Sequence, residues 1–208
     1  MKNSSLIEQE CIKYGLIDIQ TFDPTIKVDL KYASSDNFMH ENMYGELKKA
    51  YLELGLAQAL ILVQRDLKAI NPYLSLVIYD AARPISIQEK MFEKVQHTNM
   101  EKYVANPYTD QRGSFHNYGM AADIGIQDSS EQAIDMGTKF DYFGEEAHVG
   151  IEEKLLKEKR ISMEAYKNRK MLYYITSKHN LVPYEFEWWH YQFYIYEEDK
   201  KKFALLDF

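Results

Sequence analysis

Cysteine is almost absent from this sequence of 208 residues, in which Cys11 is the single example. An intrachain disulfide and a zinc site built from cysteines are therefore excluded. No run approaches about 18 consecutive apolar residues, so the sequence predicts no transmembrane helix and no membrane partner. A domain of this length buries about 70% of the surface of its unfolded chain, and it needs neither a disulfide nor a metal merely to fold.

Positive charge is also in short supply, since 25 Lys and Arg stand against 32 Asp and Glu, a net charge of −7. This balance argues against nucleic acid or an anionic membrane as a partner bound through bulk electrostatics. Residues 1–5 lack the apolar core of a signal peptide. We therefore expect a cytoplasmic protein, with a periplasmic or secreted location as the alternative if a signal peptide has been removed.

Repeats, low-complexity tracts and linkers rich in Pro, Gly or Ser are missing as well, so residues 1–208 are predicted to form a single domain. Apolar periodicity and capping signals predict helices over residues 5–15, 49–70, 86–97, 152–159 and 163–178. Alternating or compact apolar runs predict strands over residues 26–32, 74–79, 120–126 and 187–196. This irregular order predicts an α+β fold, with a mixed or antiparallel central sheet and helices packed mainly on one face.

The residues best suited to chemistry gather in two places, and the first is the segment Ser114–Asp123. His116 and Asp123 are seven residues apart, an odd number that would place them on opposite faces of one regular strand. If a loop ends at Gly119 and a strand follows, the loop can fold His116 back beside Asp123. Gly125 would share the face of Asp123 and leave room there for an ion.

The second place is the segment Glu187-Trp188-Trp189-His190. Glu187 and His190 differ by three positions, so a regular strand would separate them, whereas a turn or bulge through the tryptophans can direct both toward one cavity. We therefore hypothesise a zinc site with His116, Asp123 and His190 as ligands and water in the fourth position. Three protein ligands plus water is the pattern of catalytic rather than structural zinc.

Two charged residues complete this hypothesis. Glu187 is expected to act as the general base, which takes a proton from the water and passes it to the leaving amine. Arg83 remains ionised, and Pro84 stiffens the backbone beside it, so Arg83 is the candidate for stabilising the oxyanion. Each motif alone is weak, because such spacings also arise by chance. In particular, Asp80 and Arg83 could form a plain surface pair.

Together the motifs resemble the D-alanyl-D-alanine dipeptidases of the vancomycin-resistance type. These belong to a wider zinc group that includes D-Ala-D-Ala carboxypeptidases, phage endolysins and the hedgehog signalling domain. The resemblance covers most of the chain, and it rests on Asp80-x-x-Arg83-Pro84, Ser114-x-His116-x-x-Gly119-x-Ala121-x-Asp123 and Glu187-Trp188-Trp189-His190. Further matches in the family's order lie within residues 29–38, 136–141 and 168–169.

The resemblance implies hydrolysis of the free dipeptide D-Ala-D-Ala to two D-alanines, with one Zn²⁺ per chain. His116, Asp123 and His190 match the zinc ligands of the family. Glu187 matches the catalytic base, and Arg83 matches the arginine that stabilises the transition state. The expected partner is therefore a small dipeptide substrate, and the oligomeric state stays open.

Three further residues acquire roles from the resemblance. Asp141 matches an acidic residue that holds the ammonium group of the dipeptide, and a carboxylate in a small closed pocket can do so through a charge-assisted hydrogen bond. Ser114 lies where the family has a substrate-contacting serine, and Asp80 is expected to orient Arg83. The sequence departs from well-known members at Ala82, where they carry Tyr, and the smaller side chain enlarges the space beside Arg83.

Two other interpretations remain open. A D,D- or L,D-peptidase that trims cell-wall peptides outside the cytoplasm would need an open groove, where a dipeptidase needs a small pocket. A zinc-stabilised binding domain would keep the fold without catalysis, but it would have no need of Glu187 and Arg83 beside the metal. The biological role, whether antibiotic resistance, D-alanine recycling or wall turnover, does not follow from these residues.

Overall fold

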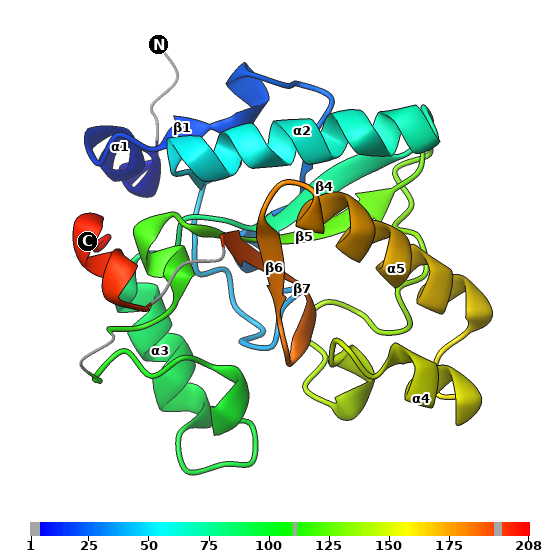
Figure 1. Ribbon diagram of the computed structural model, residues 1–208. Helices are drawn as coiled ribbons and strands as arrows, with labels where there is room; N and C mark the ends of the chain where they lie inside the picture. The colour runs from blue at the N-terminus through cyan, green and yellow to red at the C-terminus, as the bar shows by residue number, and fades with distance from the viewer. Residues whose placement is uncertain (1–4, 110–111, 194–196) are drawn as a thin grey trace.

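A mixed sheet of five strands, in the order β2-β4-β5-β7-β6, lies at the centre of the protein (Figure 1). The computed structural model describes residues 5–109, 112–193 and 197–208. The strands are β2 (Lys27–Val28), β4 (Ser75–Asp80), β5 (Ala121–Gln127), β6 (Leu181–Tyr184) and β7 (Glu187–Phe193). β2 runs parallel to β4, and the other neighbours are antiparallel. The predicted α+β fold with a mixed central sheet is confirmed.

Helices α2 (Leu54–Ile70) and α5 (Met163–Ser177) cover one face of this sheet (Figure 1). α2 contacts both β4 and α5, and α5 contacts β6. The side of α2 that faces inward is apolar at helical spacing, with Leu56, Leu60, Val63 and Leu67 buried. These contacts form the main core behind β4 and β5, so the strands that carry the candidate site rest on a rigid support.

The remaining elements surround the ends of the sheet. The other α-helices are α1 (Leu6–Lys13), α3 (Ile85–Val95) and α4 (Glu152–Lys157). Short 3-10 helices are η1 (Ile19–Thr21), η2 (Lys31–Ala33), η3 (Glu101–Tyr103), η4 (Phe115–Tyr118), η5 (Glu145–Ala147) and η6 (Glu197–Lys202). A second, two-stranded sheet pairs β1 (Ile17–Asp18) with β3 (Tyr51–Leu52). Within the described residues, no helix has the length and apolar character needed to cross a membrane.

The predicted helix over residues 49–70 begins too early. Tyr51 and Leu52 pair with β1, and the helix starts only at Leu54. The reason lies at Glu53, whose carboxylate accepts hydrogen bonds from the backbone N–H groups of Gly55 and Leu56 and so caps the helix. Apolar residues occur at helical spacing both before and after Glu53, so periodicity alone could not locate the start of the helix.

Two other local predictions are wrong in part. Of the strand predicted over residues 26–32 only Lys27–Val28 is extended, because the chain turns into η2 at Lys31. Ser86 does not cap the helix predicted over residues 86–97, since α3 already begins at Ile85 and the Ser86 hydroxyl donates to the carbonyl of Phe208. By contrast, the Ser5 hydroxyl caps α1 as predicted.

The last predicted strand, over residues 187–196, is confirmed for Glu187–Phe193. Residues 194–196 lie outside the described part of the chain. The last described segment, 197–208, returns to the start of α3, where the backbone N–H of Ile85 donates to the carbonyl of Leu206. The backbone N–H of Leu206 donates in turn to the carbonyl of Asn117 in η4. The end of the chain is therefore joined to the segment that carries His116.

Candidate metal centre and active site

His116 lies on η4, a single turn that directs its imidazole inward. Ser114 caps this turn by accepting from the backbone N–H of His116, and Gly119 ends it with a φ of 68° in the left-handed region. Glycine adopts that conformation without the strain of a side chain. The chain then enters β5 at Ala121, so the predicted fold-back of His116 beside Asp123 is confirmed.

Asp123 and His190 are direct cross-strand neighbours, because β5 and β7 pair in a register that sets one opposite the other. Opposed side chains on neighbouring strands point to the same face and lie close together. The expectation for Gly125 is wrong, however. A Cβ atom there would lie 2.6 Å from the ring of Tyr79, so the absent side chain makes room for that ring rather than for an ion.

The predicted irregularity in β7 is present. Glu187 pairs with Tyr184, whereas Tyr191 pairs with Pro183, so the register shifts across Trp188–His190. Glu187 and His190 are three positions apart and would lie on opposite faces of a regular strand. Because of the bulge, both line the same cavity. The two tryptophans are buried, as their bulk favours, and Trp189 also lines the cavity.

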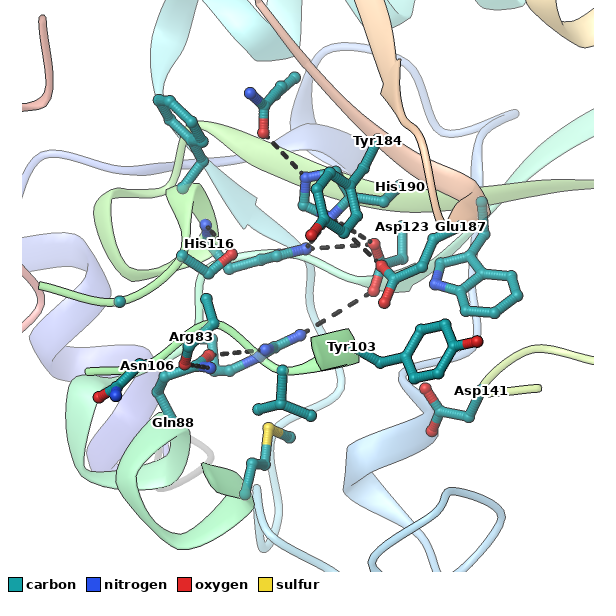
Figure 2. A pocket seen from close by; sticks show the side chains of 18 of the residues that line it. Arg83, Gln88, Tyr103, Asn106, His116, Asp123, Asp141, Tyr184, Glu187 and His190 are labelled. Atoms are coloured by element: carbon teal, nitrogen blue, oxygen red, sulfur yellow. Dashed lines mark hydrogen bonds and ion pairs between the residues drawn. The ribbon is translucent and has the colours of Figure 1, made fainter. Parts of the chain in front are cut away.

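Three ligand atoms converge at one point, as Figure 2 shows. Nε2 of His116 lies 3.1 Å from Oδ1 of Asp123 and 3.1 Å from Nδ1 of His190. The remaining pair, Nδ1 of His190 and Oδ1 of Asp123, is 3.2 Å apart. Zinc bonds of 2.0–2.1 Å would set tetrahedral ligands about 3.3 Å apart. The triangle thus has nearly the size that a tetrahedral ion requires.

The outer hydrogen bonds of both imidazoles determine which ring nitrogen carries the lone pair. Nδ1 of His116 lies 2.7 Å from the carbonyl oxygen of Ala81, which can only accept, so the proton is on Nδ1. Nε2 of His190 lies 3.0 Å from Oε1 of Gln192 and donates to it in the same way. In the neutral rings, lone pairs therefore face the Asp123 carboxylate from two sides. Such an arrangement is repulsive unless a cation lies between the three atoms, which is how metal-binding histidines are oriented.

The charge state of Asp123 agrees with this role. Burial opposes its charge, but in the absence of a metal ion the imidazoles of His116 and His190, when protonated, hold its pKa below the ordinary value of 3.8. Asp123 is therefore available as a carboxylate. Among the residues that the structure describes, these three form the group of His, Cys, Asp or Glu whose ligand atoms lie close enough to hold a metal ion.

Glu187 lies beside this triangle, with Oε2 3.9 Å from Nδ1 of His190 (Figure 2). Its side chain lines the cavity and is mostly buried, with 13% of its surface exposed. Burial, together with the negative charges of Asp123 and Asp141, raises the pKa of Glu187 well above its ordinary value. A carboxyl group at this distance can exchange a proton with a water molecule bound between it and the three ligand atoms.

Arg83 belongs to a buried network, which excludes the alternative of a plain surface pair with Asp80. Asp80 is completely buried and Arg83 is 8% exposed. Oδ2 of Asp80 accepts from Nε and Nη2 of Arg83 at 2.9 and 2.5 Å, and Oε1 of Gln88 accepts from Nη1 at 2.8 Å. Tyr44 donates to the other oxygen of Asp80 at 2.5 Å.

This network determines where the guanidinium of Arg83 points. With Asp80 and Gln88 bound to it, Arg83 directs Nη2 toward Asp123, 3.9 Å from Oδ2 (Figure 2). Burial works against the positive charge, but Asp80 raises the pKa of Arg83 above its ordinary value. A permanent, oriented cation therefore lies next to the candidate metal centre.

Asp141 lies on the other side of the cavity from His116, with Glu187 between them (Figure 2). Its carboxylate accepts from the Tyr32 hydroxyl at 3.0 and 3.1 Å and from the backbone N–H of Phe38 at 3.1 Å. Burial nevertheless raises its pKa from 3.8 to about 7. A cationic group entering the cavity would restore the ionised form of Asp141.

The elevated pKa of Asp141 predicts a pH-dependent stability difference in metal-free protein. The protonated carboxyl group of Asp141 adds to the free energy of unfolding. This contribution is fully present below pH 3.8, the ordinary pKa, and it is lost as the pH rises through about 7, the pKa in the folded protein. We expect Asp141→Asn to gain up to about 2 kcal/mol relative to the parent between pH 5 and pH 8, because the amide never has to carry a buried charge. Urea unfolding of both proteins at the two pH values measures this gain.

The matched control for that experiment is Asp207→Asn, which changes an exposed carboxylate. Its difference from the parent is expected to stay constant between the two pH values. An Asp141→Asn difference that is equally flat would show that Asp141 titrates as an ordinary surface carboxylate.

The cavity that unites these groups has a volume of about 340 Å³. Arg83, Ser114, Asp141 and Glu187 line it together with the three candidate ligands. This volume lies at the lower end of the range of about 300–1,000 Å³ typical of small-molecule sites. The cavity is therefore suited to a small substrate, and the structure brings every site residue predicted from the sequence to it or, for Asp80, directly behind it.

Sequence reasoning missed the residues that orient the site. Gln192 had a usable signal, since it follows His190 by two positions on a strand and must share its face. Gln88 and Tyr44 carried no signal, because their partners Arg83 and Asp80 are reached only through the packing of α3 and the segment before β3. Tyr32 was expected in a strand, but η2 turns its hydroxyl toward the cavity instead.

An arrangement that can hold one metal ion and position a carboxyl group beside a water ligand is typical of metal-dependent hydrolases. Comparison with known proteins narrows this class. Residues 13–202 match the peptidase M15 family, described as D-ala-D-ala dipeptidase. The chain therefore belongs to this peptidase family, whose members are generally metal-dependent.

A curated relative points the same way. The chain is 27% identical over 180 residues to the D-alanyl-D-alanine dipeptidase of Escherichia coli (strain K12). The match covers 85% of this chain and 83% of that protein. The resemblance inferred from the motifs is confirmed at the level of the family.

Proposed function

We propose that this protein is a zinc-dependent dipeptidase that hydrolyses D-Ala-D-Ala to two D-alanines. The observation that carries the proposal is the convergence of three lone-pair ligand atoms, from His116, Asp123 and His190, beside the buried carboxyl group of Glu187. Family membership supports the reaction class, and the name of the Escherichia coli relative supports the substrate.

His116, Asp123 and His190 would hold the metal. Two imidazole nitrogens and one carboxylate oxygen, with a position left for water, are a donor set that zinc favours in catalytic sites. When bound, Zn²⁺ supplies Lewis acidity toward the scissile carbonyl and lowers the pKa of a ligated water to about 7. The carbonyl of Ala81 and the amide of Gln192 keep both rings in the orientation that this binding needs.

Glu187 and Arg83 would carry the chemical step. Glu187 accepts a proton as water adds to the carbonyl carbon, and it gives this proton to the amide nitrogen as the C–N bond breaks. The charge that develops on the carbonyl oxygen is stabilised by Arg83, which Asp80 and Gln88 hold ready before the substrate arrives. Asp80 therefore acts through the orientation of Arg83.

Asp141 would select a free amino terminus. Its carboxylate is already held by Tyr32 and Phe38, so it offers a fixed acceptor to the ammonium group of a dipeptide. Ser114, at the opposite side of the cavity, would contact the rest of the substrate. A cavity of about 340 Å³ favours this small substrate over the long wall peptides that a trimming peptidase cleaves in an open groove.

A metal analysis combined with a substrate panel tests the proposal. We expect about one zinc per chain, and we expect removal of the metal to abolish activity and zinc to restore it. The panel contains D-Ala-D-Ala, D-Ala-D-Lac, L-Ala-D-Ala and a wall pentapeptide. Cleavage of D-Ala-D-Ala without cleavage of the pentapeptide supports the dipeptidase.

The other outcomes distinguish the alternatives. Cleavage of the pentapeptide in preference to the dipeptide would identify a wall-trimming peptidase. Zinc-loaded protein that cleaves no member of the panel would favour a zinc-stabilised binding domain.

A further inference from the structure

Tyr184 is a cavity residue whose position depends on the same bulge as that of Glu187. It is the last residue of β6, and beyond the register shift in β7 it pairs directly with Glu187. Cross-strand partners direct their side chains to the same face of a sheet and lie close together. The side chain of Tyr184 therefore lies beside Glu187, and both residues line the cavity.

The ring of Tyr184 also lies next to a candidate metal ligand. Its centre is 5.8 Å from the centre of the His190 ring and 5.4 Å from that of the Phe186 ring, and both contacts are edge-to-face. Such contacts between rings are attractive and help to hold the phenol in one orientation. Figure 2 shows the hydroxyl end of Tyr184 pointing inward, toward the three candidate ligands.

Arg83 approaches the candidate ligands from the opposite side. Four strands of the sheet have the order β4-β5-β7-β6, in which Asp123 belongs to β5 and His190 to β7. Arg83 follows the end of β4, whereas Tyr184 ends β6, so the two residues flank the ligands from either side (Figure 2). A substrate carbonyl at the candidate metal centre would therefore lie between a guanidinium and a phenol.

The hydroxyl of Tyr184 is available to a substrate. Tyr184 is 37% exposed, and its hydroxyl forms no hydrogen bond within the described part of the chain. Two other tyrosines line the cavity, but the hydroxyl of Tyr32 donates to Asp141, and that of Tyr103 lies 3.4 Å from Nε2 of His148. Of these three tyrosines, Tyr184 therefore offers a donor beside the candidate metal centre.

We propose that Tyr184 is a further catalytic residue, whose hydroxyl donates a hydrogen bond to the tetrahedral intermediate of dipeptide hydrolysis. When water adds to the scissile carbonyl carbon, Glu187 takes a proton from the water, and the electron pair of the carbonyl π bond moves to the carbonyl oxygen. Arg83 and Tyr184 then donate to this negatively charged oxygen from two sides. Tyr184 keeps its own proton throughout, so no further proton transfer is needed. This inference rests on the proposed function and deepens it.

Replacing Tyr184 with Phe tests this role, because it removes the hydroxyl and keeps the ring that contacts His190 and Phe186. We expect kcat for D-Ala-D-Ala to fall about 10–100-fold, the range for the loss of a hydrogen bond to a charged group. The oxygen of the intact amide carries less charge, so KM should change by less than about threefold. Zinc content per chain should stay as in the parent. Steady-state kinetics and metal analysis measure these quantities.

A phosphinate analogue of the dipeptide probes the same contact without turnover. In this compound a phosphinate and a methylene group replace the scissile carbonyl and the amide nitrogen, so its charged tetrahedral phosphorus imitates the intermediate. Zinc-loaded Tyr184→Phe should bind the analogue about 10–100-fold more weakly than the parent does, as measured by titration calorimetry. The dissociation constant does not depend on the fraction of folded protein, so partial misfolding of the variant cannot imitate this result.

The matched control is Tyr73→Phe, which removes the hydroxyl of an exposed tyrosine between α2 and β4, outside the cavity lining, and should behave as the parent does. A Tyr184→Phe enzyme with the parental kcat and the parental affinity for the phosphinate would overturn this inference and leave the dipeptidase intact. A rise in KM with unchanged kcat would overturn it too, since Tyr184 would then bind the substrate equally well before and during the reaction. A zinc-loaded parent that does not cleave D-Ala-D-Ala would overturn the proposed function and this inference with it.

Discussion

Replacing Glu187 with Gln is expected to lower kcat for D-Ala-D-Ala by at least about 10²-fold while the bound zinc remains. The amide has the shape of the carboxyl group but cannot accept a proton from water, and a positioned acid-base group contributes about 10²–10⁴-fold. The three candidate metal ligands are untouched, so the zinc content per chain should stay as in the parent. Steady-state kinetics together with metal analysis on the same sample measures both quantities.

The matched control is Glu185→Gln. Glu185 lies two positions away in the exposed turn between β6 and β7, so its replacement changes the same functional group outside the cavity. We expect this variant to keep the parental kcat. If Glu187→Gln hydrolysed the dipeptide at the parental rate with its zinc in place, the general base would have to be another residue.

Replacing Arg83 with Lys is the second substitution with a large expected effect, a fall of about 10²–10³-fold in kcat. Removing one donor that is aimed at a developing oxyanion has a cost of this size. A lysine keeps the positive charge but lacks the planar guanidinium. Its single ammonium group cannot bind Asp80 and Gln88 and at the same time point toward Asp123. Because the loss concerns the transition state, kcat should fall far more than KM rises.

Arg65→Lys provides the comparison, since Arg65 is exposed on α2, remote from the cavity lining. Both variants should show the circular dichroism spectrum of the parent and a full zinc content. An Arg83→Lys enzyme with unchanged kcat would limit Arg83 to a structural role in the Asp80 network.

The sequence was sufficient for much of the fold, and its errors have local causes. Long periodic segments such as Leu54–Ile70 and compact apolar runs such as Ser75–Asp80 identify themselves, because their side chains must be buried on one or both faces. The secondary structure of Tyr51 and Leu52 could not be predicted in this way, because a pair of apolar residues is compatible with the pattern of a helix and with that of a short strand. Their assignment depends on pairing with β1, which lies more than 30 residues earlier in the chain.

The candidate site divides in a similar way. The candidate metal ligands were evident from the sequence. His116, Asp123 and His190 belong to motifs that, taken together, identify the family. Their convergence was a hypothesis that needed two irregularities, a loop that ends at Gly119 and a turn or bulge through Trp188-Trp189. The structure has both, with Gly119 in the left-handed region and a register shift across Trp188–His190.

What the sequence by itself determined is therefore the chemical inventory and the family: one cysteine, no long apolar run, and imidazoles and carboxylates in the order of a D-ala-D-ala dipeptidase. Only the tertiary structure decided which ring nitrogens of His116 and His190 face Asp123, and where Arg83 points. The physical reason is that these properties arise from hydrogen bonds and packing between segments far apart in the chain. A backbone carbonyl such as that of Ala81 looks the same in every sequence, and its effect appears only once folding has placed a histidine next to it.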